Sequence, residues 1–448
     1  MRTRNGLAVL FLAVAGGVCP AFAQIDPAVV ADPVAAHTTL LKDYHGSGEN
    51  GWRHFEEACK RLEEVHKRVP RGEQGRLGLD PTDVPAFLSV REIDDPAVRH
   101  IRAYVVEFEK SGAGAALRRM RTAPFAYVPF PAGMSMEEAH RNERQIPSAA
   151  RGLASATIAR MRIAAEKMQP DEVVELLADG LALAGAFYGR LTLLDSMAAM
   201  GIEQVVLDEC SRLVQEGHFE EPTLAKIAKL LEDESLHTQL DAMEDGEWLR
   251  LMWDGRDTYL KPSADAEQWE RFLREYEACQ RELFENRTSP RFVAVWDHLP
   301  GFRYRENLDR PDIKVKCVLE LLVTHRDTRH LYALRRRAAI VFVALERARL
   351  ADGRYPKDLG ALVPRFLDEI PTDPATGDEP IYRTGMFPAS IGDFELYFKG
   401  LDRADNKGHE GRATRYDAAG EERPAMRPPG RAPGTDWVPV RRRAVREP

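Results

Sequence analysis

Apolar residues recur at intervals of three and four along most of this 448-residue chain. Such spacing places them on one face of an α-helix, which must be buried against another element. Trp52, Phe55 and Cys59 follow this pattern, and similar segments end at polar or Gly-containing pairs such as Gly217-His218. Short connections favour antiparallel neighbours. The sequence therefore predicts a mainly α protein, with a helical bundle or array over residues 24–328.

The N-terminal 23 residues have the composition of an export signal. Two arginines precede an apolar stretch at residues 7–15, and Ala21-Phe22-Ala23 forms a small-x-small cleavage site. We therefore expect a signal peptide over residues 1–23 and a mature chain that begins at Gln24. The expected location of that chain is periplasmic or secreted.

Two features speak against membrane anchoring of the mature chain. A lipoprotein signal at Cys19 is the alternative to cleavage, but it requires a small residue directly before the cysteine, and Val18 occupies that position. Beyond the signal, no uninterrupted apolar run reaches the ~20 residues that a bilayer demands. We expect no transmembrane helix in the mature chain.

The charge balance gives no support for nucleic acid as a partner. The chain has 63 basic and 71 acidic residues, and its net charge is −8. Proteins that bind nucleic acid present a basic patch or stripe instead. We expect a solvated surface, with an envelope protein as the possible partner.

Four cysteines remain after removal of the signal: Cys59, Cys210, Cys279 and Cys317. None belongs to a Cys-x-x-Cys pair, so their spacing does not indicate a structural zinc site. In an oxidising compartment four cysteines allow three pairings, and the sequence does not choose among them.

A different pattern begins at Tyr332, where an amphipathic helix is predicted to run to Asp352-Gly353. The proline after Tyr355 then favours an extended chain. Two β-prone runs, Ile381-Tyr382-Arg383 and Phe394–Phe398, can pair as an antiparallel hairpin that closes on the helix. The sequence predicts a small C-terminal α+β module over residues 329–420. The Pro- and Arg-rich tail, residues 421–448, is expected to be largely disordered.

The module carries three short motifs in order: Gly353-Arg354-Tyr355-Pro356, Pro371-Thr372-Asp373-Pro374 before Gly377, and Tyr397 three residues before Gly400. Together they resemble the globular part of type II secretion pseudopilins. The whole chain is similar to exported, mostly helical bacterial proteins of unknown function that carry such a module at the C-terminal end.

One departure from pseudopilins limits what the resemblance implies. In pseudopilins the comparable helix continues from an N-terminal signal and is apolar. Here it begins 331 residues into the chain and carries Arg335-Arg336-Arg337. We therefore expect a shared small fold and no role as a membrane-embedded polymerisation stem, because function belongs to sites and not to folds.

The resemblance also implies a candidate calcium site. Some pseudopilins bind calcium in a loop near their last strands, and the similar loop here contains Asp402, Asp405 and Asn406. Their oxygen atoms are the ligand type that calcium prefers. Arg403 and Lys407 oppose a cation, and a solvated turn held by Asp and Asn side chains is the alternative.

Enzyme motifs are weak. The glycines of Gly46–Gly51 match a dinucleotide-binding pattern by letter, but they follow a helix-like segment where that pattern needs a strand. The histidines at positions 37, 45, 54 and 66 form no recognisable ligand set. The acidic cluster from Glu232 to Glu247 has the residues for paired catalytic carboxylates, although a solvated face is favoured.

These patterns predict an exported, non-catalytic protein that acts as an envelope scaffold or interaction partner. The alternative is an envelope hydrolase with its site in the helical body.

Overall fold

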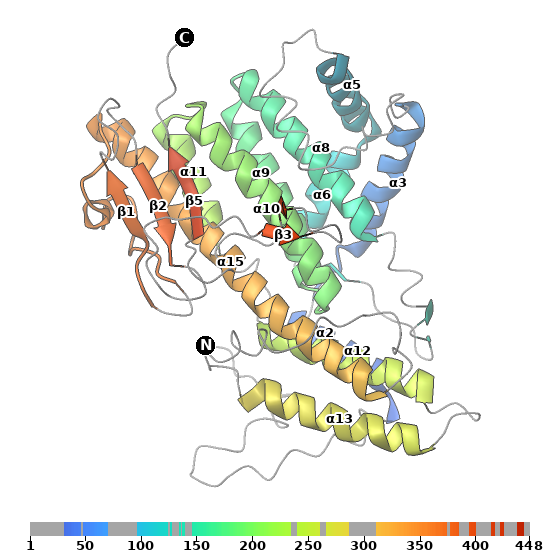
Figure 1. The fold of residues 1–448 in the computed structure, drawn as a ribbon. Coiled ribbons are helices and arrows are strands. Elements are labelled where there is room, and N and C mark those ends of the chain that lie inside the picture. The colour runs from blue at the N-terminus through green and yellow to red at the C-terminus, as the bar shows by residue number, and fades with distance from the viewer. Residues whose placement is uncertain are drawn as a thin grey trace.

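The computed structural model describes residues 31–45, 48–69, 96–123, 126–127, 134–135, 137–138, 146–233, 240–259, 266–285, 311–373, 377–384, 394–399, 414–416, 422–424 and 437–442. The predicted signal peptide, residues 1–23, lies outside them. Within them the chain is mainly helical with a small C-terminal sheet, which confirms the predicted fold class (Figure 1). The helices are α2 (Pro33–His45), α3 (Trp52–Arg68), α5 (Pro96–Ser111), α6 (Ala113–Thr122), α8 (Ile146–Glu166), α9 (Pro170–Tyr188), α10 (Leu193–Gln215), α11 (Glu221–Leu231), α12 (Leu240–Tyr259), α13 (Ala266–Glu285) and α15 (Pro311–Asp352).

The main core is built around α9, which packs against both α8 and α10. Leu153, Leu176, Phe187 and Leu213 are among the side chains buried there. The links between these helices are short, as predicted. The side-chain oxygen of Thr192 accepts a hydrogen bond from the amide of Asp195 at 3.2 Å and so caps the start of α10.

The segment after Gly112 is more regular than the sequence indicates. An irregular insert is predicted between Gly112 and Pro147, whereas residues 113–122 form α6. Gly112 has a φ of +78°, which lets the chain reverse sharply between α5 and α6. Beyond α6, Tyr127 is buried and its carbonyl accepts a 2.7 Å hydrogen bond from Asn50. This contact agrees with a loop that packs over the body.

The predicted helix at Tyr332 is part of a much longer one. Helix α15 begins at Pro311 and has 42 residues, so it crosses the predicted boundary between body and module. It packs on α10, α11 and α13 along its length and on β2 and β5 at its C-terminal end (Figure 1). Because α15 is covered from more than one side, two of its charged residues, Arg336 and Glu346, are buried.

The predicted hairpin is confirmed. Strand β1 (Ile381–Thr384) pairs antiparallel with β2 (Phe394–Phe398), and Ile381 lies opposite Tyr397. The ring of Phe394 lies 6.0 Å from that of Phe342 on α15, so the hairpin closes on the helix. A short 3₁₀ helix (Leu359–Leu362) precedes the sheet and buries its two leucines.

Among the described residues, the end of the predicted module and the predicted tail contribute three strands, two of which lie in the tail. Strand β5 (Trp437–Arg442) pairs antiparallel with β2 and gives the order β1-β2-β5. Strands β3 (Thr414–Tyr416) and β4 (Glu422–Pro424) pair with each other. Strand β5 was not foreseen because its partner strand lies about forty residues earlier, and composition alone does not report such pairing.

Two cysteines, Cys59 and Cys210, carry free thiols. Burial raises the pKa values of Cys59 and Cys210 to about 12, so both thiols stay protonated and unreactive at neutral pH. The side chain of Cys317 lies outside the described part of α15. Among the described helices, none is long and apolar enough to span a membrane.

Packing between α12 and α13 predicts the effect of Gly255→Ala. A Cβ at Gly255 would lie 2.3 Å from the ring of Phe272, so the helices must move apart. We expect a loss of about 1–3 kcal/mol in the free energy of unfolding. Gly201→Ala is the control, because a Cβ at Gly201 in α10 would have no neighbouring atom within 4 Å and alanine favours a helix by about 1 kcal/mol. Urea unfolding that shows equal effects at both positions would contradict the packing.

Candidate functional site

The residues proposed for calcium, Asp402, Asp405 and Asn406, lie outside the described residues. In the described part of the chain, no group of three or more His, Cys, Asp or Glu side chains is arranged to hold a metal ion. The calcium site therefore stays a prediction.

The acidic cluster does not form one solvated face. Glu232 is exposed after the end of α11, whereas Glu244 is buried within α12. Glu247 accepts a 3.0 Å hydrogen bond from the amide of Leu193, at the start of α10. The expectation of a uniformly solvated face is wrong for Glu244, because α12 packs against several other helices. The carboxylates of this segment therefore lie in different surroundings.

The four histidines of the first helices also have separate surroundings. His45 lies 2.6 Å from the carbonyl oxygen of Gly189, and His66 lies 3.3 Å from the hydroxyl of Tyr104. The ring of His54 lies near two carboxylates at the surface of α3. His37 is buried within α2.

A buried serine and histidine lie side by side where α10 meets α15. Nε2 of His325 is 2.8 Å from Oγ of Ser196, and neither side chain is more than 2% exposed. Burial, followed by the charge of Arg329, lowers the pKa of His325 to about 3. The imidazole is therefore neutral at physiological pH and a poor proton acceptor.

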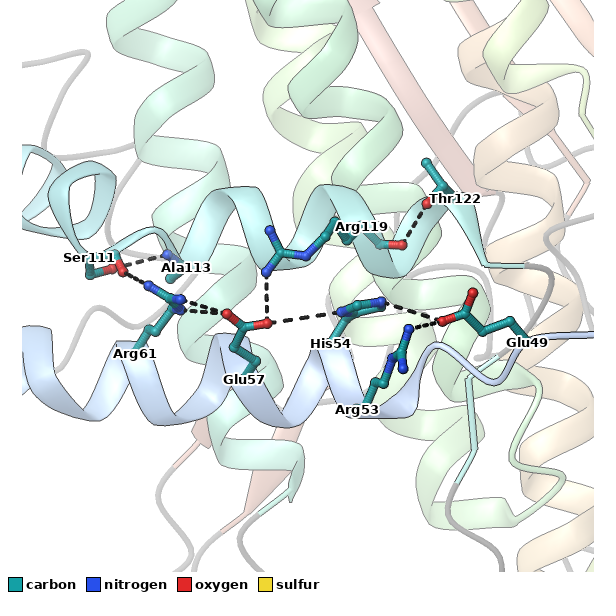
Figure 2. Close-up of polar contacts among 9 residues, drawn as sticks. All are labelled: Glu49, Arg53, His54, Glu57, Arg61, Ser111, Ala113, Arg119 and Thr122. Carbon is teal, nitrogen blue, oxygen red and sulfur yellow. Dashed lines mark hydrogen bonds and ion pairs between the residues drawn. The ribbon is translucent and has the colours of Figure 1, made fainter.

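A charged surface that was not predicted from the sequence lies between α3 and α6. Figure 2 shows Glu57 of α3 between Arg61 of the same helix and Arg119 of α6. Arg61 donates to Glu57 at 2.6 and 3.0 Å, and Arg119 donates at 2.7 Å. These hydrogen bonds lower the pKa of Glu57, and the bond from Arg119 has the largest effect. The carboxylate thus links two helices.

The same surface reaches the turn between α5 and α6. Arg61 donates a 2.5 Å hydrogen bond to the carbonyl oxygen of Ser111, and the hydroxyl of Ser111 accepts from the amide of Ala113 at 3.1 Å (Figure 2). A Cβ at Gly112 would lie 2.8 Å from Nη1 of Arg61. The glycine at this turn therefore makes room for the arginine.

A cavity of about 400 Å³ opens beside this turn, lined by the end of α5, by α6 and by Arg160 of α8. Gly112, Gly114 and Ala115 leave the space, and Arg118 and Arg119 border it. Oε1 of Glu172 accepts a 3.1 Å hydrogen bond from Arg160 and forms a longer ion pair, at 3.6 Å, with Arg118. The arrangement can bind an anionic group through guanidinium donors.

Asp179 lies behind Arg118 and is almost completely buried. Its carboxylate is 3.5 Å from Nε of Arg118 and 3.2 Å from Nη1 of Arg121. Burial raises the pKa of Asp179 to about 6, although both arginines act in the opposite direction. At neutral pH the ionised Asp179 holds Arg118 in place from the interior side.

The sequence contains one local signal for this cavity. Small residues from Gly112 to Ala116 come directly before three arginines, Arg118, Arg119 and Arg121. Such a run can leave a hollow bordered by long cationic side chains. Arg160 and Glu172, however, come from other helices, and nothing in the spacing places them at the same point.

Comparison with protein-family models, curated proteins and solved structures finds no match for this chain. The resemblance to pseudopilins therefore rests on the motifs within the chain itself.

Proposed function

We propose that this chain is an exported protein, periplasmic or secreted, that acts without catalysis as an envelope scaffold or interaction partner. The observation that carries the proposal is the position of α15. This single helix packs against body helices along its length and supports the C-terminal sheet at its end. Body and module therefore form one continuous structure, which suits a scaffold that presents a rigid binding surface to a partner.

Arg336 fixes α15 to the body. Its Nε donates a 2.7 Å hydrogen bond to the carbonyl of Leu231, and its Nη2 donates at 2.5 Å to that of Asp233. Its Nη1 lies 3.5 Å from Glu203, which also accepts a 2.9 Å hydrogen bond from Tyr188. Separation of α15 from the body would break these contacts and leave buried charges without partners, which is costly.

The pseudopilin-like segment serves here as a folded cap under the same proposal. A polymerisation stem must expose an apolar helix to lipid or to other copies, whereas residues 338–345 of α15 are buried within this chain. The cap is then available for contact with an envelope protein through its sheet, while the helix remains internal.

The alternative, a hydrolase with its site in the helical body, is favoured by one observation, the 2.8 Å contact between Ser196 and His325. A serine nucleophile needs access to substrate and a histidine that accepts its proton. Ser196 is fully buried, and the pKa of His325 is about 3. The contact fits a structural hydrogen bond better.

Ser196→Ala separates these two interpretations. We expect it to leave any hydrolysis of p-nitrophenyl esters at the wild-type level and to lower the free energy of unfolding by about 1 kcal/mol, the net worth of one hydrogen bond. Ser155→Ala is the matched control, because Ser155 is buried in α8 and donates to the carbonyl of Arg151. Ester hydrolysis lost in Ser196→Ala and retained in Ser155→Ala would establish the hydrolase.

Export is tested directly by the N-terminus of the protein in its own cells. Mass spectrometry of the periplasmic and secreted fractions is expected to show a chain that begins at Gln24. A version with Ala21 and Ala23 both changed to bulky Leu is the control, and cleavage at this site should fail in it. A full-length chain that starts at Met1 and stays in the cytoplasmic fraction would contradict the proposal.

A further inference from the structure

We propose that the cavity between α5, α6 and α8 binds a phosphate group, with Arg118 and Arg160 as the residues that contact it. The inference goes beyond the scaffold function and does not depend on where the chain is located. It rests on the shape of the cavity, on the hydrogen-bonding state of its arginines and on the charges around them.

The shape is maintained by glycine. A Cβ at Gly114 would lie 2.7 Å from Nη1 of Arg160, so any larger residue would push that guanidinium aside. Arg160 in turn packs over the ring of Phe108, 5.9 Å from its centroid. An arginine held between a glycine and an aromatic ring is oriented before a ligand arrives, which reduces the entropy lost on binding.

Some N–H donors of the two arginines at this cavity have no hydrogen-bond acceptor at normal distance within the described part of the chain. The Nε atoms of Arg118 and Arg160 are both buried, and neither has a hydrogen-bond acceptor among the described residues. The closest carboxylate oxygens lie 3.5 Å from Nε of Arg118 and 3.6 Å from Nε of Arg160, beyond the usual hydrogen-bond length of about 3 Å. Buried donors without acceptors are rare in folded proteins and call for an explanation. An oxyanion in the cavity adds acceptors for guanidinium groups that their resident carboxylates satisfy only in part.

The neighbouring acids set the strength of the site. Glu172 gives one oxygen to two arginines and is partly exposed, so an entering phosphate can replace it at Arg118. Arg119 is engaged with Glu57 and contributes charge at longer range. Asp179 stays behind Arg118 and fixes its position. This balance predicts modest affinity, because the phosphate competes with two resident carboxylates, Glu172 and Glu109, and Glu109 itself lines the cavity.

Phosphate fits the cavity better than other ligand classes. Two guanidinium groups from different helices match an ion that has several oxygens and up to two charges. The cavity, at about 400 Å³, admits a phosphate with a small attached group and leaves that group near solvent. A free phosphate ester and a phospholipid head group share this chemistry, so the test must tell them apart.

The test is isothermal titration of the mature protein with inorganic phosphate, for wild type and two variants. In Arg118→Ala we expect affinity to fall at least about tenfold, since a charge-assisted hydrogen bond is lost. Arg53→Ala is the matched control: Arg53 is exposed on α3, pairs with Glu49 and lies away from the cavity lining. Its affinity should stay within about twofold of wild type, because distant surface charges are screened by salt.

A third variant and a second probe complete the test. Gly114→Ala should weaken phosphate binding by displacing Arg160 while the net charge is unchanged, and circular dichroism confirms that each variant is folded. Vesicles that contain phosphatidylglycerol form the second arm. Binding of vesicles but not of free phosphate, lost in Arg118→Ala and kept in Arg53→Ala, supports the site and assigns the phosphate to a lipid. No saturable binding of either probe, or equal weakening in Arg53→Ala, overturns it.

Discussion

Arg162→Met is expected to lower the free energy of unfolding by about 3–5 kcal/mol, because it leaves a buried carboxylate without its main partner. Arg162 of α8 and Glu209 of α10 are both buried, and Nε of Arg162 lies 2.8 Å from Oε1 of Glu209. Among the described residues, the other cation paired with Glu209 is Arg212, at 3.6 Å. Burial raises the pKa of Glu209, and the charge of Arg162 is the strongest influence that lowers it. Loss of Arg162 therefore makes the ionised Glu209 carboxylate less stable in the folded protein.

The double variant Arg162→Met/Glu209→Leu is the control for this prediction. Removal of both charges should restore most of the lost stability, since apolar replacements of a buried pair are often neutral or stabilising. Urea unfolding of wild type, the single variant and the double variant measures the coupling. A single variant that loses less than about 1 kcal/mol would show that this pair is solvated, as surface pairs are.

Acid is expected to destabilise the protein through two buried histidines. The pKa of His37 is lowered to about 3 by burial and by the charges of Arg250 and Arg190, and that of His325 is lowered to about 3 by burial and by Arg329. Below the unfolded value of 6.5 the unfolded chain takes up protons that the folded chain does not. Stability therefore falls as pH falls from about 6.5 to about 3, by about 2 kcal/mol for each histidine at pH 5.

The buried acids act in the opposite direction, so the histidine effect must be isolated. The folded pKa of Asp179, about 6, lies above its ordinary 3.8, and its contribution to stability falls as pH rises through that window. His325→Gln removes one titrating group and keeps a polar side chain beside Ser196. We expect the loss of stability between about pH 7 and pH 5 to shrink by about 2 kcal/mol.

The control for the pH experiment is His218→Gln, because His218 follows the end of α10 and its side chain is partly exposed. Chemical denaturation at each pH gives the free energies of unfolding. An unchanged pH dependence in His325→Gln would mean that His325 is solvated in the folded state, and the packing of α15 on α10 would then be wrong.

The sequence predicted those parts of the fold that depend on neighbouring residues. Spacing of apolar residues predicted a helical body and placed α3 within it, although it missed α6. The β-prone runs located the hairpin, whose register places Tyr382 opposite Leu396. Helix α15 was predicted too short because its N-terminal half carries charges on a helix that is covered by several partners. A two-sided helix loses the simple amphipathic pattern on which the prediction relied.

The candidate sites depend on residues far apart in the chain, which explains why they were missed. Ser196 and His325 are separated by 129 positions, and Arg336 and Glu203 by 133. Spacing within one helix contains no information on such pairs. At the cavity, the glycines and Arg118 are visible as a local run, but Arg160 reaches it only because α8 packs beside α5 and α6 in the folded chain.

The C-terminal half of α15 is, in this interpretation, an interior helix shared by the body and the cap. Hydrogen–deuterium exchange of the mature protein measures this most directly. Amides of Leu334–Ala348 should exchange as slowly as those of α9, because both are in the main core and open only with global unfolding. Fast exchange of Leu334–Ala348 while α9 remains protected would contradict the interpretation and would leave this helix free to act as an assembly stem.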